Sequence, residues 1–190
     1  MQTRVFFVRH AQPDLSVKDD LLRPLTEKGK RDAEKVTKTL RGQNIDVIYS
    51  SPLKRAYDTV KDLAQEIGVA INPVDDFRER KIDNVWVNDF REFSRRQWDD
   101  FNFKLEHGEC LNEVQKRNIE ALYEVIETNR GLNIVIATHG TALATIINYF
   151  NHDFGYDDFW LMIDKMPYIL CFTFDEMELA GMEEWKLVIE

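Results

Sequence analysis

Two histidines and two arginines occupy positions in this sequence that suggest phosphate chemistry. Arg9 and His10 directly follow a run of apolar β-forming residues, and His139 follows a second such run. Arg55 comes shortly after a third run, in the stretch Ser50–Ala56. A neutral imidazole can attack phosphorus, and a guanidinium group matches the oxygens of a phosphate monoester through paired hydrogen bonds. The four side chains together predict a pocket that binds a phosphoryl group.

Buried strands must bring these residues together, because each of them lies at or just beyond a predicted strand end. The expected strands cover residues 5–8, 45–49, 69–71 and 134–137, and the expected helices cover residues 27–41, 52–67 and 111–129. The second helix is expected to begin at Pro52 and to be capped by the serine before it. This alternation predicts an α/β fold: a three-layer sandwich of a mostly parallel sheet with helices on both faces. Ligands of such sheets gather at the carboxyl ends of the strands.

Two segments depart from the alternation. Residues 77–107 are charged, rich in aromatic residues and free of glycine and proline, which predicts a helical insertion that covers the active site. Later in the chain, Tyr168–Phe174 and Glu184–Ile189 are expected as two strands joined through Gly181, closing an edge of the sheet. The length of 190 residues indicates a single domain over residues 1–190.

Composition limits the partners that we expect. With 34 acidic and 25 basic residues the net charge is −9, which disfavours nucleic acid or an anionic membrane as the main partner. The apolar stretches are far shorter than the roughly 20 residues that span a bilayer, and no signal-peptide pattern is visible. Cys110 and Cys171 lie in separate segments, so a reducing, cytoplasmic location is expected. Neither metal nor cofactor is expected, because the sequence has no closely spaced ligand pair.

Three motifs occur in order, each at a predicted strand-to-helix junction: Arg9-His10, Ser50–Ala56 and Ala137–Thr141. In this respect the chain resembles the histidine phosphatase superfamily (phosphoglycerate-mutase-like family, branch 1) over about residues 4–150. The resemblance implies a phosphoglycerate-mutase-like fold. It also implies that His10 is the nucleophile, that His139, when protonated, hydrogen-bonds the oxygens of the transferring phosphoryl group, and that Arg9 and Arg55 bind phosphate.

The leaving alkoxide needs a proton, and the resemblance assigns the general acid to Glu79. In many members of the family the acid follows the third strand in an apolar-x-Glu context, which Phe77-Arg78-Glu79 matches. Asp83 is the alternative acid, because the glycine and second acidic residue that usually follow are replaced here by Lys81–Trp86.

Weaker matches and simpler interpretations stand beside these assignments. Gln12 occupies a position where the family often has a polar residue that contacts phosphate, and Gly140 allows close backbone approach. Glu109 lies near a frequent Gly-Glu-Ser motif, and both Gln12 and Glu109 could equally be ordinary polar loop residues. The arginines could instead form structural ion pairs. Arg23 and the basic residues of the insertion are candidates for a second anionic group on the substrate, or for a solvated helix face.

These features imply a metal-independent phosphomonoesterase of the histidine acid phosphatase type, which hydrolyses a small phosphorylated metabolite through a phosphohistidine. One alternative is a phosphoglycerate mutase, which passes the phosphoryl group to a second position on the sugar acid. The family's mutases usually carry an Asn-Glu-Arg-x-Tyr-Gly-like stretch, which Phe77–Ile82 replaces. Another alternative is a phosphate-binding regulator that keeps the fold without turnover. The sequence defines neither the substrate nor the oligomeric state.

Overall fold

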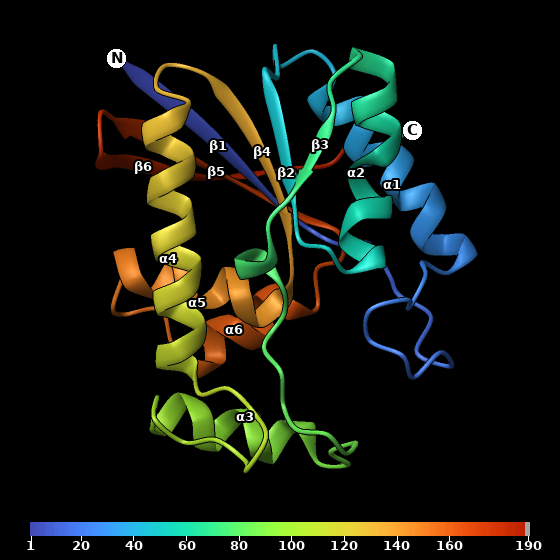
Figure 1. The fold of residues 1–190 in the computed structure, drawn as a ribbon, viewed down its shortest axis with the longest axis vertical. Helices are drawn as coiled ribbons and strands as arrows, with labels where there is room; N and C mark the ends of the chain where they lie inside the picture. Colours follow the sequence, from blue (N-terminus) through green and yellow to red (C-terminus); the bar gives the residue numbers. More distant parts are fainter. Residues whose placement is uncertain (189–190) are drawn as a thin grey trace.

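The computed structural model describes residues 1–188 and contains one six-stranded sheet (Figure 1). Its strands are β1 (Gln2–Arg9), β2 (Val47–Ser50), β3 (Ile71–Pro73), β4 (Asn133–Thr138), β5 (Tyr168–Asp175) and β6 (Glu178–Trp185). The helices are α1 (Glu27–Leu40), α2 (Lys54–Ile67), α3 (Phe90–Asp99), α4 (Leu111–Thr128), α5 (Gly140–Phe150) and α6 (Tyr156–Ile163), and η1 (Asp75–Phe77) is a 3₁₀ turn. The strand order is β3-β2-β4-β1-β5-β6, in which β5 pairs antiparallel with both β1 and β6 and the other neighbours pair in parallel. The predicted mostly parallel α/β sheet is therefore confirmed.

Helices cover both faces of the sheet, because the central strands are apolar on both sides. In β1, Phe6 and Val8 pack into a core that includes residues of α1 and α2. Val5 and Phe7, which point the other way, pack into a second core with residues of α4, α5 and α6. Figure 1 shows these two helical layers on opposite sides of the strands.

The parallel strands end at the same level, which brings distant parts of the chain together. Arg9 is paired with Thr138 in the register of β1 and β4, and Ser50 is paired with Ala137 in that of β2 and β4. Beyond the strand ends, the amide of His10 donates to the Thr138 carbonyl at 3.1 Å. The carboxyl edge of β1, β4 and β2 is therefore one shared platform for the residues that follow.

Three details of the predicted elements are wrong. Helix α2 begins at Lys54 rather than Pro52, because Leu53 has an extended backbone and the Ser51 amide bonds the Ala137 carbonyl at 2.9 Å. Strand β3 lies two residues later than expected. Gly181 lies inside β6, and the turn between the last two strands falls at residues 176–177. The final residue of the predicted last strand, Ile189, lies outside the described residues.

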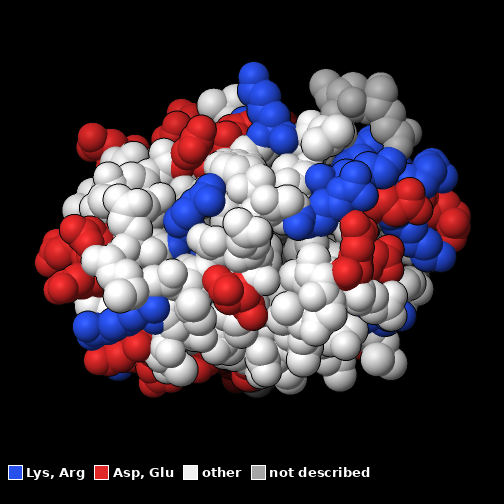
Figure 2. Space-filling model, turned by 90° about the horizontal axis from the view of Figure 1, so that it is seen from above, with Lys and Arg blue, Asp and Glu red and all other residues white. Residues whose placement is uncertain are grey.

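Surface charge is mixed on the face that Figure 2 shows, where Lys and Arg alternate with Asp and Glu and uncharged surface separates the groups. No helix within residues 1–188 is long and apolar enough to cross a membrane.

Candidate active site

The rings of His10 and His139 face each other at the carboxyl ends of β1 and β4. Their centroids lie 5.1 Å apart, with an angle of 59° between the ring planes. His10 is 6% exposed and His139 is fully buried. Strand pairing thus brings together two imidazoles that are more than a hundred residues apart in sequence.

The surroundings of His10 leave one ring nitrogen free to act as a nucleophile. Its Nδ1 lies 2.7 Å from the Ala11 carbonyl, and a carbonyl can only accept, so Nδ1 carries the proton of the neutral ring. Burial, followed by the nearby charges of Arg55 and Arg9, lowers the pKa of His10 well below 6.5. His10 is therefore neutral near pH 7, with an unprotonated Nε2.

The Arg9 guanidinium is anchored along one edge. Its Nη1 donates to the carbonyl of Ile163, the last residue of α6, at 2.6 Å, and to that of Lys165, just beyond the helix, at 2.8 Å. Its Nε is buried without a partner among the described residues. Burial lowers the pKa of Arg9 to about 10, although Glu79 opposes the shift. Arg9 is therefore still protonated near neutral pH and retains donors for an anion.

Gly140 leaves room for this guanidinium. A Cβ atom at position 140 would lie 3.3 Å from the Arg9 Nε, tighter than most side-chain contacts. The side chains of Arg9 and Ile163 therefore lie close to the backbone at Gly140, and a phosphate contact there stays a prediction.

Arg55 lies in the first turn of α2 and is only 3% exposed. Its Nη1 donates to the backbone carbonyl of Asp20 at 2.8 Å and lies 3.2 Å from the Asp20 carboxylate. Burial lowers the pKa of Arg55, while Asp20 and Glu79 act in the opposite direction. The ion pair considered from sequence exists, but the contacts found engage a single nitrogen of Arg55.

Arg23 organises the loop that contains Asp20. It donates to the Val17 carbonyl at 2.8 Å, to the Lys18 carbonyl at 3.2 Å and to the Asp20 carboxylate at 3.0 Å. The charge of Arg23 also contributes to lowering the pKa of His10, after burial and other arginines. The same loop reaches the insertion, since the Lys18 Nζ lies 4.0 Å from the centroid of the Trp86 ring.

Glu79 is attached to the beginning of α5. Its carboxylate oxygens accept from the backbone amides of Thr141 at 3.0 Å and Ala142 at 3.2 Å. The Thr138 hydroxyl donates to the Phe77 carbonyl at 3.1 Å and fixes the preceding residues against β4. The backbone thus positions Glu79 beside the strand end that carries His139.

The alternative acid, Asp83, lies in a different local setting. Its Oδ1 accepts from the amide of the next residue, Asn84, at 2.7 Å. Asp83 is not among the charges that shift the pKa values of Arg9 and Arg55, whereas Glu79 contributes to both. Of the two carboxylates, Glu79 is the one that the structure brings to the histidines and arginines.

Arg117 of α4 is a supporting residue that sequence reasoning missed. It donates to the carbonyls of Asp76 at 2.6 Å and Arg78 at 2.9 Å, and its Nε lies 2.9 Å from the Glu109 carboxylate. Burial alone would raise the pKa of Glu109, but hydrogen bonds from Arg117 and from the Lys81 amide hold it below the ordinary value. Glu109 and Arg117 thus hold the segment that carries Glu79. The sequence signal that could have indicated this role is an arginine beside the apolar face of α4.

Other sequence candidates are held in local contacts. Gln12 is exposed, and its Oε1 accepts from the Thr26 hydroxyl at 2.9 Å. Several basic residues of the insertion bond or stack on neighbouring side chains: Arg78 on Glu109, Arg80 on Gln97, Arg91 on Trp160, Arg95 on Tyr156 and Arg96 on Phe103. These contacts account for much of the positive charge of the insertion.

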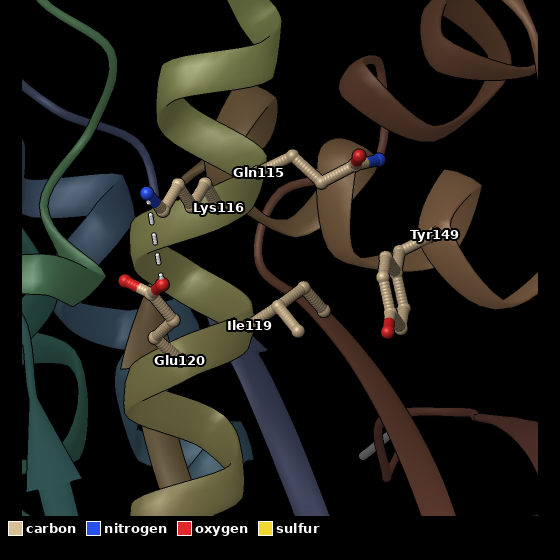
Figure 3. A pocket seen from close by; sticks show the side chains of 5 residues that line it. All are labelled: Gln115, Lys116, Ile119, Glu120 and Tyr149. Atoms are coloured by element: carbon tan, nitrogen blue, oxygen red, sulfur yellow. Dashed lines mark ion pairs between the residues drawn. The ribbon is translucent and has the colours of Figure 1, made fainter.

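A surface hollow of about 270 Å³ lies away from this cluster, along α4 (Figure 3). Gln115, Lys116, Ile119, Glu120 and Tyr149 line it. Within this lining, the Lys116 Nζ lies 4.0 Å from the Glu120 Oε1. None of the histidines or arginines described above lines the hollow. Within residues 1–188, no group of three or more His, Cys, Asp or Glu side chains is arranged to hold a metal ion.

The fold and the cluster define an α/β protein with a site of two histidines and two arginines at the carboxyl edge of its sheet. The chain belongs to the histidine phosphatase superfamily (branch 1), whose sequence profile matches residues 5–178.

Named relatives fall into two activity groups. The chain is 31% identical over 160 residues to a 2,3-bisphosphoglycerate-dependent phosphoglycerate mutase of Thermoplasma acidophilum, covering 75% of this chain and 74% of the relative. It is 29% identical over 153 residues to phosphoserine phosphatase 1 of Hydrogenobacter thermophilus, covering 72% and 70%. Among solved structures, mycobacterial hydrolase 1 has the same fold, with a TM-score of 0.80 at 18% identity over 97% of this chain and 98% of that one.

Proposed function

We propose that the protein is a phosphatase that hydrolyses a small phosphorylated metabolite through a phosphohistidine at His10. The observation that carries this proposal is the pair of rings 5.1 Å apart, flanked by two buried arginines whose contacts leave donors for an anion. A phosphoryl group bound beside both rings would meet a nucleophile on one side and hydrogen-bond donors around it.

The first step moves the phosphoryl group to the protein. Nε2 of His10 forms a bond to phosphorus as the bond from phosphorus to the leaving oxygen breaks. Glu79, in its protonated form, gives its proton to that oxygen and releases the alcohol. Arg9 and Arg55 hold the phosphoryl oxygens, with the Gln12 amide and the backbone at Gly140 as further contacts.

The second step restores the enzyme. Glu79, now a carboxylate, takes a proton from a water molecule that attacks the phosphorus of phosphohistidine. The bond from phosphorus to Nε2 breaks, and inorganic phosphate leaves. No metal or cofactor is needed in this scheme.

A phosphoglycerate mutase is the second candidate, and the similarity to the Thermoplasma acidophilum relative favours it. In that reaction the phosphohistidine returns its phosphoryl group to another hydroxyl of a sugar acid. A third possibility, a phosphate-binding regulator, would retain the site without turnover.

A substrate screen separates the three candidates. The protein is incubated with an aryl phosphate and with a panel of phosphorylated metabolites that includes both monophosphoglycerates, with and without catalytic bisphosphoglycerate. Release of inorganic phosphate is measured together with interconversion of the phosphoglycerates. We expect phosphate release that His10→Ala abolishes and that His152→Ala, at an exposed histidine, leaves intact. Interconversion without net release would identify a mutase, and no turnover would identify a binding protein.

A further inference from the structure

The side chain of Ser51 holds the ring of His139. The Ser51 Oγ lies 2.8 Å from Nε2 of His139, and both residues are fully buried. The same oxygen accepts from the Leu53 amide at 3.2 Å, and the Ser51 amide bonds the Ala137 carbonyl at 2.9 Å. Ser51 is therefore fixed between the end of β2 and the end of β4.

This arrangement determines where the proton of Ser51 points. A serine hydroxyl has one proton to donate. The Leu53 amide donates to the Oγ, and Nε2 of His139 is the other hydrogen-bond partner of this oxygen within residues 1–188. The hydroxyl proton enters a hydrogen bond only if it is donated to Nε2, which then accepts with its lone pair.

The proton of His139 must then lie on the opposite side of the ring. Burial, followed by the charges of Arg55 and His10, lowers the pKa of His139 well below 6.5, so the ring is neutral near pH 7. A neutral imidazole that accepts at Nε2 carries its proton on Nδ1. Nδ1 is buried and has no hydrogen-bond partner among the described residues, and a buried donor without an acceptor costs free energy.

We infer that Ser51 is a positioning residue that keeps neutral His139 protonated at Nδ1, so that this N–H donates to an oxygen of the bound phosphoryl group. His139 thus acts as a neutral donor, and the positive charge at the site comes from the arginines. The identity of the acceptor rests on the proposed function, whereas the position of the proton in the free protein does not.

Nitrogen NMR of histidine-labelled protein tests the proton position, because the two ring nitrogens of a neutral imidazole have well-separated shifts when one is protonated. His139→Gln assigns the signals. The free wild-type protein should show His139 with a protonated Nδ1, and Ser51→Ala should move the proton to Nε2. Ser50→Ala is the matched control, because its hydroxyl bonds the Ser51 carbonyl at 2.8 Å rather than a ring. A wild-type ring protonated at Nε2, or a Ser51→Ala ring unchanged from wild type, would overturn the inference.

Steady-state kinetics test the consequence for catalysis. Loss of one hydrogen bond to the phosphoryl group should lower kcat/KM of Ser51→Ala about tenfold, and vanadate should inhibit this variant more weakly. Ser50→Ala should match wild type. A shifted tautomer with unchanged kinetics would refute the positioning role. If wild type hydrolyses no phosphomonoester, the proposed function fails, but the NMR result still decides where the His139 proton lies.

Discussion

In the proposed mechanism, the groups around His10 make its ring nucleophilic. The Ala11 carbonyl accepts a hydrogen bond from Nδ1–H of His10, and burial together with two arginines keeps the ring uncharged. These same arginines would attract the phosphate dianion, so one set of charges serves both substrate binding and activation of the nucleophile.

Replacement of Glu79 should affect substrates according to their leaving groups. Glu79→Gln removes the acidic proton, so kcat for an alkyl phosphate should fall about 10²- to 10³-fold, as for loss of a general acid. An aryl phosphate with a good leaving group should lose far less, because its leaving oxygen needs less protonation. Asp83→Asn is the control and should leave both rates unchanged. A loss that depends on the leaving group in Asp83→Asn instead would transfer the role to Asp83.

The buried histidines should make the protein less stable in mild acid. The pKa values of His10 and His139 lie below 6.5 in the folded state. Between those values and 6.5 the unfolded chain binds protons that the folded protein does not, so the free energy of unfolding rises with pH in this range. On acidification below 6.5, each histidine should therefore lower the free energy of unfolding. Urea unfolding on both sides of 6.5 measures this, and His10→Asn should show a weaker pH dependence than His152→Ala. A stability that rises on acidification would contradict the expectation.

At the scale of elements, the ends of β1, β2 and β4 position the histidines and arginines of the site, and α4 positions Glu79, the proposed general acid. Arg117 of α4 donates to three backbone carbonyls of the segment that leads to Glu79. They belong to Asp76, Arg78 and Glu79 itself, the last at 3.4 Å. Glu109 connects the same arginine to Arg78 and Lys81. Helix α4 therefore positions Glu79 indirectly, through hydrogen bonds from Arg117 to backbone carbonyls.

Loss of Arg117 should weaken both stability and catalysis. Arg117→Ala leaves the Glu109 carboxylate with fewer donors, so the free energy of unfolding should fall by about 2–3 kcal/mol. The rate with alkyl phosphates should fall as Glu79 loses its support. Lys116→Ala, at the exposed neighbouring position seen in Figure 3, should have little effect on either quantity. Equal effects of the two substitutions, measured by urea unfolding and steady-state kinetics, would contradict this role for α4.

The sequence predicted the strands that lead into the site more accurately than it predicted the contacts between elements. The strands before His10 and His139 are short apolar runs, so their ends can be located from local pattern alone. The predicted start of α2 was wrong because the local sequence around Ser51 resembles a helix cap. In the structure, however, the Ser51 amide bonds the carbonyl of Ala137 in β4, and its hydroxyl bonds the ring of His139. The support from Arg117 depends on contacts 38 to 41 residues away, which no local pattern contains.

At the scale of the whole molecule, an acidic protein with net charge −9 contains a small buried cluster of arginines. The electrostatic field of this net negative charge disfavours anions, so the proposed anion binding would depend on Arg9 and Arg55 at the carboxyl edge of the sheet. The unfolded chain has no such cluster. Phosphate binding should therefore favour the folded state specifically.

Inorganic phosphate should stabilise the folded protein through this cluster. At 100 times the dissociation constant, a ligand specific for the folded state adds about 2.7 kcal/mol to the free energy of unfolding. Thermal unfolding should show the rise with phosphate but not with chloride of equal ionic strength. Arg55→Met should abolish the effect, and Arg41→Met, at an exposed arginine paired with Glu66, should retain it. Equal stabilisation of both variants would show that phosphate binds elsewhere.

The most direct measurement is the capture of the phosphorylated protein itself. Protein is mixed with a radiolabelled substrate found in the screen, quenched in alkali and digested, and the labelled peptide is identified. The mechanism predicts an acid-labile, alkali-stable label on the peptide that contains His10. The label should be lost in His10→Ala and kept in His152→Ala. Label on another residue, or label that persists in His10→Ala, would contradict the assignment of His10 as the nucleophile.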